Sequence, residues 1–488
     1  MGHRMLLPFS LAVLFLSLPG TANAETLELK DCRIHDTTGA ASIHAECGYL
    51  TVPENPDEPQ GKTIALFVAR IPTLNQQRSE QAFTLLAGGP GQAASEAFVA
   101  YSKVLQRVRS SHDILLVDQR GTGKSNRLSC DSSPEDALLE WDEEKATEML
   151  TRCRDGLSGD PRFYTTSVAV QDLDAVREAL GYTQMVVYGG SYGTRVAQHY
   201  LRRFPEHTQS LILDGVVPAD MALGPRIALD AQHALDVIFE RCKANAECNS
   251  AFPDLTAAFE RLKSTLRSAP VELQLTDPNT GITAPATLSY ASMAAAVRLL
   301  SYRSESAALL PLLISEADKG NYGPITAQGM MVMKSLEEAM AYGMHNAVVC
   351  AEDAPFFIQD EIDVEALEKT YLGKEQVTAI QTICKVWPRG LADPDIKEPL
   401  VSDKPVLLLS GEADPITPPK FAEQVAAHLG NARHLVGPGQ GHGMLGVGCI
   451  PRLVTDFVKD PSLENLDGEC VKRLGPSPFF LDFNGPTP

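Results

Sequence analysis

The chain alternates short apolar runs with longer amphipathic stretches over its first part and again near its end. The apolar runs end in glycine or polar turn residues, which is typical of buried strands. Helical patterns lie between them, for example at 168–181 and 191–204. The runs that predict strands are 63–71, 83–87, 113–118, 184–189, 210–216, 405–411 and 433–439. This alternation predicts an α/β fold with a mostly parallel central sheet flanked by helices.

The pattern changes between residues 217 and 399, where helix formers dominate and strand signals are few. Helical stretches occur there at 228–244, 255–268, 292–301 and 332–343. We interpret 217–399 as a large helical cap domain inserted between two strands of the sheet. The chain has 488 residues, more than the roughly 250–300 at which a single core stops growing. The expected core therefore has a first part at 25–216 and a second part at 400–488.

Residues 1–24 have the pattern of a secretory signal peptide. Arg4 is followed by an apolar run at 6–20 and by the small-residue sequence "ANA" at 22–24. A membrane anchor is the alternative, but the run is shorter than the roughly 20 residues that span a bilayer. No later segment is apolar enough to span. We expect cleavage after Ala24 and a secreted or periplasmic protein without a membrane anchor.

The ten cysteines all follow Ala24, which suits an oxidising compartment. They fall into pairs that are close in sequence, and the hypothesis of nearest-neighbour pairing predicts five disulfides. These are Cys32–Cys47, Cys130–Cys153, Cys242–Cys248, Cys350–Cys384 and Cys449–Cys470. A zinc site is the rival interpretation, but no close cysteine pair faces another with ligand spacing. We expect no metal.

The formal net charge is −20, from 62 acidic and 42 basic residues. Nucleic acids and anionic membrane surfaces are bound by clustered Lys and Arg. The excess of acidic residues therefore argues against nucleic acids and anionic membranes as partners. It leaves the oligomeric state open.

Ser191 lies in the sequence "VVYGGSYGTR" at 186–195, which contains the pattern G-x-S-x-G. An apolar strand precedes this pattern and a helix follows it. In that context the serine sits on a strained strand-to-helix turn with its hydroxyl exposed, and its glycine neighbours allow the tight turn. The context predicts Ser191 to be a nucleophile.

A serine nucleophile needs a base, and the base needs an orienting acid. In folds of this type the chain order is Ser, then Asp or Glu, then His. Asp414 and His442 occur in this order, each in the loop after an apolar strand. Glu412 is the rival acid. His434 is a weaker base because it lies at the start of its strand.

The oxyanion of the reaction needs backbone N–H donors, one of them from the residue after the nucleophile. That residue is Tyr192. The second donor is expected in the loop "GGPGQ" after the strand at 83–87, where Pro90 has no N–H and Gly89 is favoured. The segment 118–125 fails as a phosphate loop because its first position is Asp118 instead of glycine. We expect no nucleotide and no other cofactor.

Five segments together resemble the prolyl and tripeptidyl aminopeptidase family of α/β-hydrolases. They are "GGPG" (88–91), "DQRGTGKS" (118–125), "GGSYGT" (189–194), "GEADPITP" (411–418) and "GHG" (441–443). The long cap and the cysteine-bearing tail look more like the secreted tripeptidyl-aminopeptidase-like members. The resemblance implies Ser191, Asp414 and His442 as the triad. Prolyl enzymes usually have histidine where this chain has Ala87, which argues against transferring a narrow proline specificity.

The resemblance also implies that acidic cap residues bind the free amino group of the substrate. An unpaired ammonium is costly to desolvate, so a facing carboxylate is physically required. The segment 346–356 offers Glu352 and Asp353 directly after a cysteine-bearing stretch. These two residues are the candidates for amine binding.

The expected protein is a serine hydrolase that cleaves amino-terminal residues or short peptides from oligopeptides through an acyl-enzyme. The same triad also suits a carboxylesterase, since only the cap would distinguish the substrates. A non-catalytic scaffold that binds a ligand is the alternative from another class. The order of the three triad residues favours the enzyme.

Overall fold

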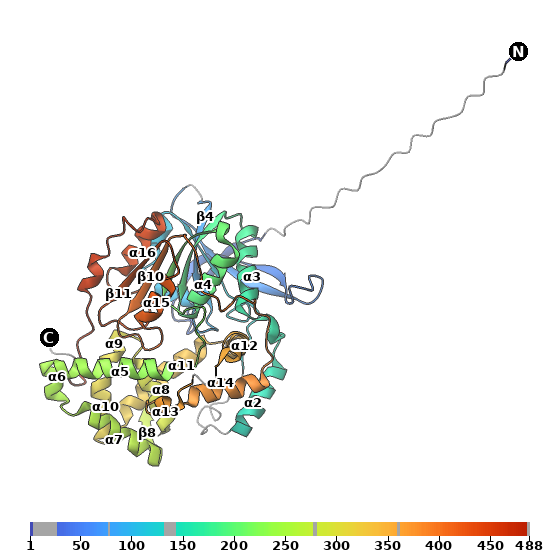
Figure 1. Cartoon of the computed structure of the whole chain (residues 1–488). Coiled ribbons are helices and arrows are strands. Elements are labelled where there is room, and N and C mark those ends of the chain that lie inside the picture. The colour runs from blue at the N-terminus through green and yellow to red at the C-terminus, as the bar shows by residue number, and fades with distance from the viewer. Residues whose placement is uncertain (3–26, 77–78, 131–142, 277–280, 359–361, 486–488) are drawn as a thin grey trace.

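A nine-stranded mixed sheet forms the centre of the computed structural model, which describes residues 1–2, 27–76, 79–130, 143–276, 281–358 and 362–485 (Figure 1). The strand order is β1-β2-β3-β5-β4-β6-β7-β10-β11. The strands are β1 (Lys30–His35), β2 (Ser42–Pro53), β3 (Thr63–Ile71), β4 (Gln81–Leu86), β5 (Asp113–Val117), β6 (Gln184–Gly190), β7 (Thr208–Asp214), β10 (Val406–Gly411) and β11 (Ala432–Gly437).

The first four strands in this order pair antiparallel, and those from β5 to β11 pair parallel. All seven strands predicted from apolar runs are present in the structure, within two residues at every end. The prediction missed β1 and β2. Both lie toward one edge and expose many of their residues, so their sequences contain no continuous apolar run.

Two apolar layers cover the two faces of the sheet, because successive side chains of a strand point to opposite faces. In β6, for example, Met185 and Val187 belong to one layer, and Val186 and Tyr188 belong to the other. Helices α3 (Thr166–Ala179), α4 (Tyr192–Arg203) and α15 (Pro419–Ala426) pack on the first layer. Helices α1 (Ala94–Tyr101) and α16 (Ile450–Lys459) pack on the second. This arrangement is the α/β-hydrolase fold.

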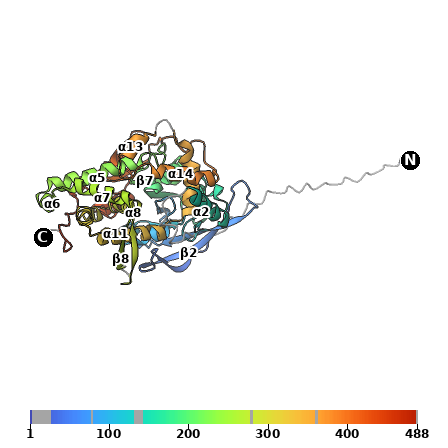
Figure 2. The same ribbon diagram turned by 90° about the horizontal axis from the view of Figure 1, so that it is seen from below.

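The chain between β7 and β10 forms a helical layer, which lies below the sheet in Figure 1 and faces the viewer in Figure 2. Most of its helices share an apolar core of their own, whereas apolar residues at 341–350 belong to the first layer of the sheet. The helices of the helical layer are α5 (Ile227–Ala244), α6 (Ala246–Ala251), α7 (Leu255–Ser268), α8 (Tyr290–Leu300), α9 (Ser304–Ala307), α10 (Leu310–Asp318), α11 (Gly323–Ala339), α12 (Tyr342–Glu352), α13 (Val364–Glu368) and α14 (Glu375–Val386). It also contains the hairpin β8 (Val271–Thr276) and β9 (Thr283–Leu288).

Two features of this layer differ from the pattern in the sequence. The helical stretch 332–343 is divided between α11 and α12, with a break at Met340 and Ala341. Helix α2 (Glu143–Gly156) precedes the sheet strand β6 in the chain, yet it packs beside α14 (Figures 1 and 2). The ion pair between Lys385 and Glu143 joins α14 and α2 at 2.6 Å. Neither arrangement is visible in local hydrophobic periodicity.

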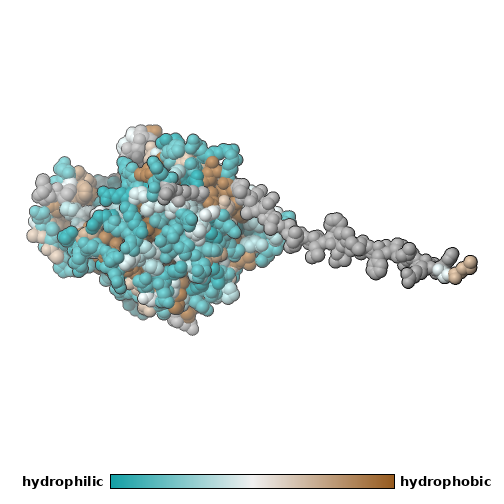
Figure 3. All heavy atoms as spheres, turned by 90° about the horizontal axis from the view of Figure 1, so that it is seen from above, coloured by the Kyte–Doolittle hydropathy of each residue, from teal (hydrophilic) through white to brown (hydrophobic). Residues whose placement is uncertain are grey.

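All five predicted disulfides are confirmed, with Cα–Cα distances from 5.1 to 6.4 Å. They indicate a compartment outside the cytoplasm, where disulfides form and persist. Among the described residues, the structure contains no helix with the length and apolarity needed to span a membrane. The predicted signal peptide at 1–24 falls almost wholly outside the described residues. Figure 3 shows that hydrophilic side chains cover most of one face.

The segment 118–125 is a structural turn. The Asp118 carboxylate accepts the backbone N–H groups of Ser95 and Lys124 and the Ser95 hydroxyl. Arg120 is buried and forms an ion pair with Asp172 at 2.6 Å. The charged groups of Asp118 and Arg120 are therefore satisfied by the protein itself.

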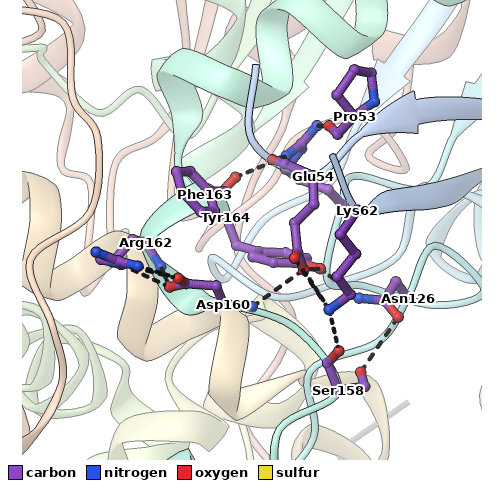
Figure 4. Close-up of polar contacts among 10 residues, drawn as sticks. Pro53, Glu54, Lys62, Asn126, Ser158, Asp160, Arg162, Phe163 and Tyr164 are labelled. Carbon is purple, nitrogen blue, oxygen red and sulfur yellow. Dashed lines mark hydrogen bonds and ion pairs between the residues drawn. The ribbon is translucent and has the colours of Figure 1, made fainter. Parts of the chain in front are cut away.

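Arg120 also donates to the Glu54 backbone carbonyl at 2.7 Å, and the Glu54 carboxylate accepts from Lys62 and from the Tyr164 hydroxyl (Figure 4). The Asp160 backbone N–H donates to the same carboxylate. This network fixes the loop that leads into α3, and so it fixes the position at which α3 begins.

Removal of the Cys350–Cys384 disulfide should lower the free energy of unfolding more than removal of Cys242–Cys248. The sequence separations are 34 and 6 residues, and the longer loop loses more conformational entropy in the unfolded chain when it is closed. The chain-entropy relation gives about 4 and about 2 kcal/mol respectively. Urea unfolding of the two double Cys→Ala variants measures both. Equal losses would contradict the entropic account of the difference.

Candidate active site

Ser191 lies between the end of β6 and the start of α4 in a strained backbone conformation, with φ 54° and ψ −122°. A positive φ is uncommon for a residue with a side chain and is held here by hydrogen bonds on both sides. The Ser191 N–H donates to the Asp214 carbonyl at 2.8 Å, and the Thr194 N–H donates to the Ser191 carbonyl at 2.8 Å. The strain that the sequence predicted for the turn is present.

The glycines on either side of Ser191 are required by close packing of the backbone. A Cβ atom on Gly189 would overlap the Gly193 carbonyl, and a Cβ atom on Gly193 would overlap the Leu86 carbonyl. The turn therefore closes against itself and against the end of β4. Only glycine fits at these two positions, which explains the spacing of the G-x-S-x-G pattern.

Asp414 and His442 are brought together by the loops after β10 and β11. His442 Nδ1 lies 2.8 Å from Asp414 Oδ2. The other carboxylate oxygen, Oδ1, accepts the backbone N–H groups of Ile416 and Thr417 at 2.9 and 2.8 Å, and the Thr417 hydroxyl donates to Oδ2 at 2.8 Å. The carboxylate is thus fixed as the acceptor for Nδ1–H, which leaves Nε2 of His442 as the basic nitrogen.

Glu412, the rival acid, and His434, the rival base, form other hydrogen bonds. Glu412 accepts the backbone N–H of Gly439 at 2.8 Å. His434 lies on β11 with its Nε2 2.9 Å from the Ser410 hydroxyl. The structure therefore pairs Asp414, and not Glu412, with the histidine.

Burial by itself lowers the pKa of the His442 imidazole, but the charge and hydrogen bond of Asp414 outweigh it, and the pKa is raised. Burial likewise raises the pKa of the Asp414 carboxyl, but His442 and the backbone donors outweigh this, and the pKa is lowered. The shifts have opposite directions. This is the behaviour of a base whose protonated form is stabilised by an orienting carboxylate.

Asp214, at the end of β7, connects the serine turn to the histidine loop. Its backbone carbonyl accepts the Ser191 N–H. Its buried carboxylate accepts the N–H groups of Met444 and Leu445, at 2.8 Å for the shortest contact to each, and the Tyr188 hydroxyl at 2.7 Å. The sequence analysis missed this residue. An aspartate at the end of a buried apolar strand, in "LILDG", was the available signal.

The neighbouring residue Gly215 shows how close the histidine lies. A Cβ atom on Gly215, which has φ +67°, would be 2.8 Å from His442 Cε1. Ser191 and His442 are therefore both packed at the carboxyl end of β7. This edge of the sheet is where α/β folds place their ligands.

Of the two residues proposed as oxyanion donors, Tyr192 directly follows Ser191, and Gly89 follows Gly88 in the loop 88–91. Tyr192 is the first residue of α4, where the backbone N–H has no partner within the helix. The loop 88–91 lies on the other side, since a Cβ atom on Gly88 would be 3.1 Å from Ser191 Cβ. Gly89 follows with φ +109°, a conformation that favours glycine.

Glu352 and Asp353 are fully buried and have partners inside the protein. Glu352 accepts the Thr166 N–H at 2.7 Å and the Thr166 hydroxyl at 2.8 Å. Asp353 forms an ion pair with Arg195 at 2.9 Å, and Lys397 lies 3.4 Å from it. Both carboxylates thus have donors within the protein, Thr166 for Glu352 and Arg195 for Asp353. Their role in amine binding stays a prediction.

The helical layer reaches the histidine through the loop between α8 and α9. The His442 N–H donates to the Tyr302 carbonyl at 2.6 Å, and the two rings meet edge to face at 5.3 Å. A cavity of about 190 Å³ lies beside Asp414, between α5 and the loop after β10. In the part of the chain that the structure describes, no group of three or more His, Cys, Asp or Glu side chains is arranged to hold a metal ion.

Known proteins resemble parts of this chain. Residues 369–470 match the family model of the TAP-like proteins. The chain is 29% identical over 245 residues to Serine protease Hip1 of Mycobacterium tuberculosis (strain ATCC 25618 / H37Rv), covering 46% of each protein. It is 31% identical over 191 residues to the tripeptidyl aminopeptidase of Streptomyces lividans, covering 35% of each. The matched region thus spans less than half the length of these curated relatives.

Among solved structures, the proline iminopeptidase of Mycobacterium smegmatis aligns with 84% of this chain and 97% of its own, at 18% identity and a TM-score of 0.36. The family match, the relatives and the order of the sheet strands agree with the motifs in the sequence. The chain thus has the α/β-hydrolase fold, and parts of it resemble the TAP-like proteins and the tripeptidyl aminopeptidases.

Proposed function

We propose that the protein is a serine peptidase that removes amino-terminal residues or short peptides from oligopeptides. The observation that carries this proposal is the Asp414–His442 hydrogen bond at the same strand end as the strained Ser191 turn. The names of the relatives, a serine protease and a tripeptidyl aminopeptidase, support peptide substrates. Residues 217–399 act as the cap that limits access to the amino-terminal end of a peptide.

The reaction begins when Ser191 Oγ attacks the scissile carbonyl carbon and its proton passes to Nε2 of His442. The carbonyl oxygen becomes an oxyanion and accepts hydrogen bonds from the N–H groups of Tyr192 and Gly89. His442 then gives its proton to the leaving amine, the C–N bond breaks, and an acyl-enzyme remains. Water then attacks the ester carbonyl while His442 accepts its proton, and His442 donates this proton to Ser191 Oγ as the ester C–O bond breaks, which releases the acid and restores the serine. Asp414 stabilises the imidazolium in both steps.

We further propose that the protein is secreted or periplasmic, with a signal peptide cleaved after Ala24. The five disulfides support a location outside the cytoplasm. The apolar run and the "ANA" sequence at 22–24 support cleavage. With Glu352 and Asp353 engaged inside the fold, we leave the carboxylate that meets the substrate ammonium unassigned.

A fluorophosphonate probe should label the protein at Ser191 and should not label Ser191→Ala, because the probe traps an activated serine. A tripeptidyl 4-nitroanilide and a 4-nitrophenyl ester, tested side by side, should both be hydrolysed by the labelled enzyme. Turnover of the ester alone would replace the peptidase proposal with a carboxylesterase. Absence of Ser191-dependent labelling in the folded protein would favour a binding scaffold.

Asp414→Asn should lower kcat by about 10⁴-fold, because the amide no longer fixes the imidazole tautomer or stabilises the imidazolium. Glu412→Gln is the matched control, since this carboxylate follows the same strand and faces Gly439. The control should keep kcat within about twofold. Steady-state hydrolysis of the anilide by both variants decides between the two acids. A larger loss of kcat in Glu412→Gln than in Asp414→Asn would make Glu412 the orienting acid.

The kcat/KM of the wild-type enzyme should fall as the pH falls, because His442 must be neutral to accept the serine proton. Asp414 raises the pKa of His442, so the fall should begin above the usual histidine value of about 6.5. In Asp414→Asn the charge that raises the pKa is gone, while the burial that lowers it remains. The acidic limb of its residual activity should therefore move to lower pH. Profiles of kcat/KM from about pH 5 to 9 test this, and an unmoved limb would contradict it.

A further inference from the structure

Helix α12 contacts the loop that carries one proposed oxyanion donor. At its amino-terminal end, the Ala341 N–H donates to the Gly91 carbonyl at 3.0 Å. The ring of His345 lies with Nδ1 3.0 Å from the Pro90 carbonyl, so Nδ1–H is the donor. Met340 packs against the same loop, 3.2 Å from the position of a Cβ atom on Gly89. Residues of the helical layer thus hold the loop that contains Gly89 in place.

The carboxyl-terminal end of α12 is linked through Thr166 to Tyr192, the residue that carries the other proposed donor. The Gln119 side chain donates to the Tyr192 hydroxyl at 3.1 Å, and this hydroxyl lies 2.7 Å from the Thr166 hydroxyl. Thr166 in turn donates to Glu352 at 2.8 Å. Because Thr166 gives its proton to the carboxylate, its oxygen accepts the proton of Tyr192. A directed chain therefore runs from Gln119 through Tyr192 and Thr166 to α12.

A second contact fixes the same part of α4. Arg195, one turn after the nucleophile, donates to both oxygens of Asp353 at 2.9 and 3.1 Å and to the Met221 carbonyl at 2.9 Å. Lys397 also donates to the Met221 carbonyl, at 2.8 Å. These groups are buried, so loss of one partner leaves an uncompensated charge that is costly in the interior. The start of α4 is therefore held firmly to α12.

Helix α12 is itself fixed in place. Its Cys350 is joined to Cys384 of α14 by a disulfide. The Gly343 N–H donates to the Leu128 carbonyl of the core at 2.9 Å. In Figure 1, α12 lies below α4. Because α12 is anchored in this way, it can hold the loop 88–91 at one end and, through Thr166, Tyr192 at the other end in fixed positions.

We propose that α12 is a positioning element for the oxyanion hole, with His345 fixing the Gly89 loop and Glu352, through Thr166, fixing Tyr192. The proposal rests on the proposed serine-hydrolase function. It gives Glu352 a role in transition-state stabilisation in place of amine binding. His345 and Glu352 do not touch the substrate, so removal of either contact should lower kcat and leave KM nearly unchanged.

The test uses paired variants of the full-length protein. His345→Ala removes the donor to Pro90, whereas His345→Asn puts an amide N–H close to the position of Nδ1. Thr166→Val removes the link between Tyr192 and Glu352, whereas Thr166→Ser keeps the hydroxyl. Each disruptive variant should lower kcat for the anilide by at least about tenfold, less than the roughly 10²–10³-fold caused by loss of a donor itself. Each conservative variant should recover most of the loss, with KM within about twofold throughout.

Val348→Ala is the matched control, because Val348 is buried in the same helix and contributes to the packing below the sheet. It should lower the thermal midpoint and leave kcat unchanged. Equal losses of kcat in the conservative and disruptive variants, or an equal loss in the control, would show a general structural effect and overturn the proposal. Wild-type kcat in both disruptive variants would also overturn it.

Fluorophosphonate labelling separates this failure from failure of the proposed function. Wild-type protein that is labelled at Ser191, together with disruptive variants that react at the wild-type rate, refutes only the positioning role of α12. Wild-type protein that is not labelled refutes the serine-hydrolase function, and the positioning role with it.

Discussion

The arrangement of the site depends on the hydrogen bonds at the carboxyl end of β7. There the Asp214 backbone carbonyl holds the Ser191 turn, and its buried carboxylate holds the loop that carries His442. A buried carboxylate without donors would be very costly, so these contacts are strongly favoured once the sheet has formed. Nucleophile and base therefore share one support, and their relative position follows from the geometry of the strand end.

The charge pairs between sheet and helical layer extend this support. Arg195 is buried beside the nucleophile turn and requires a compensating charge, which Asp353 supplies from α12. Such a pair contributes less to net stability than to the uniqueness of the arrangement, because any other placement of the helix would leave the charges unpaired. The helical layer is thus part of the site's structure as well as its cover. Tyr302 and His345 contact the two loops on which the reaction depends.

Local sequence patterns predicted much of the fold. The seven apolar runs became strands because continuous apolar segments of that length are stable only when buried on both faces of a sheet. Disulfide partners followed from proximity in the chain. The edge strand β1, its neighbour β2 and the hairpin of β8 and β9 were missed, since half-exposed strands have mixed sequences that resemble loops.

The sequence by itself determined the strained Ser191 turn and the order of Ser191, Asp414 and His442, because these depend on local glycine spacing and on strand ends. Only the tertiary structure decided that Asp414 instead of Glu412 meets His442. It also decided that Glu352 and Asp353 point into the protein, toward Thr166 and Arg195. The reason is that a buried charge selects its partner in space, and the partners here lie more than 150 residues apart in the chain.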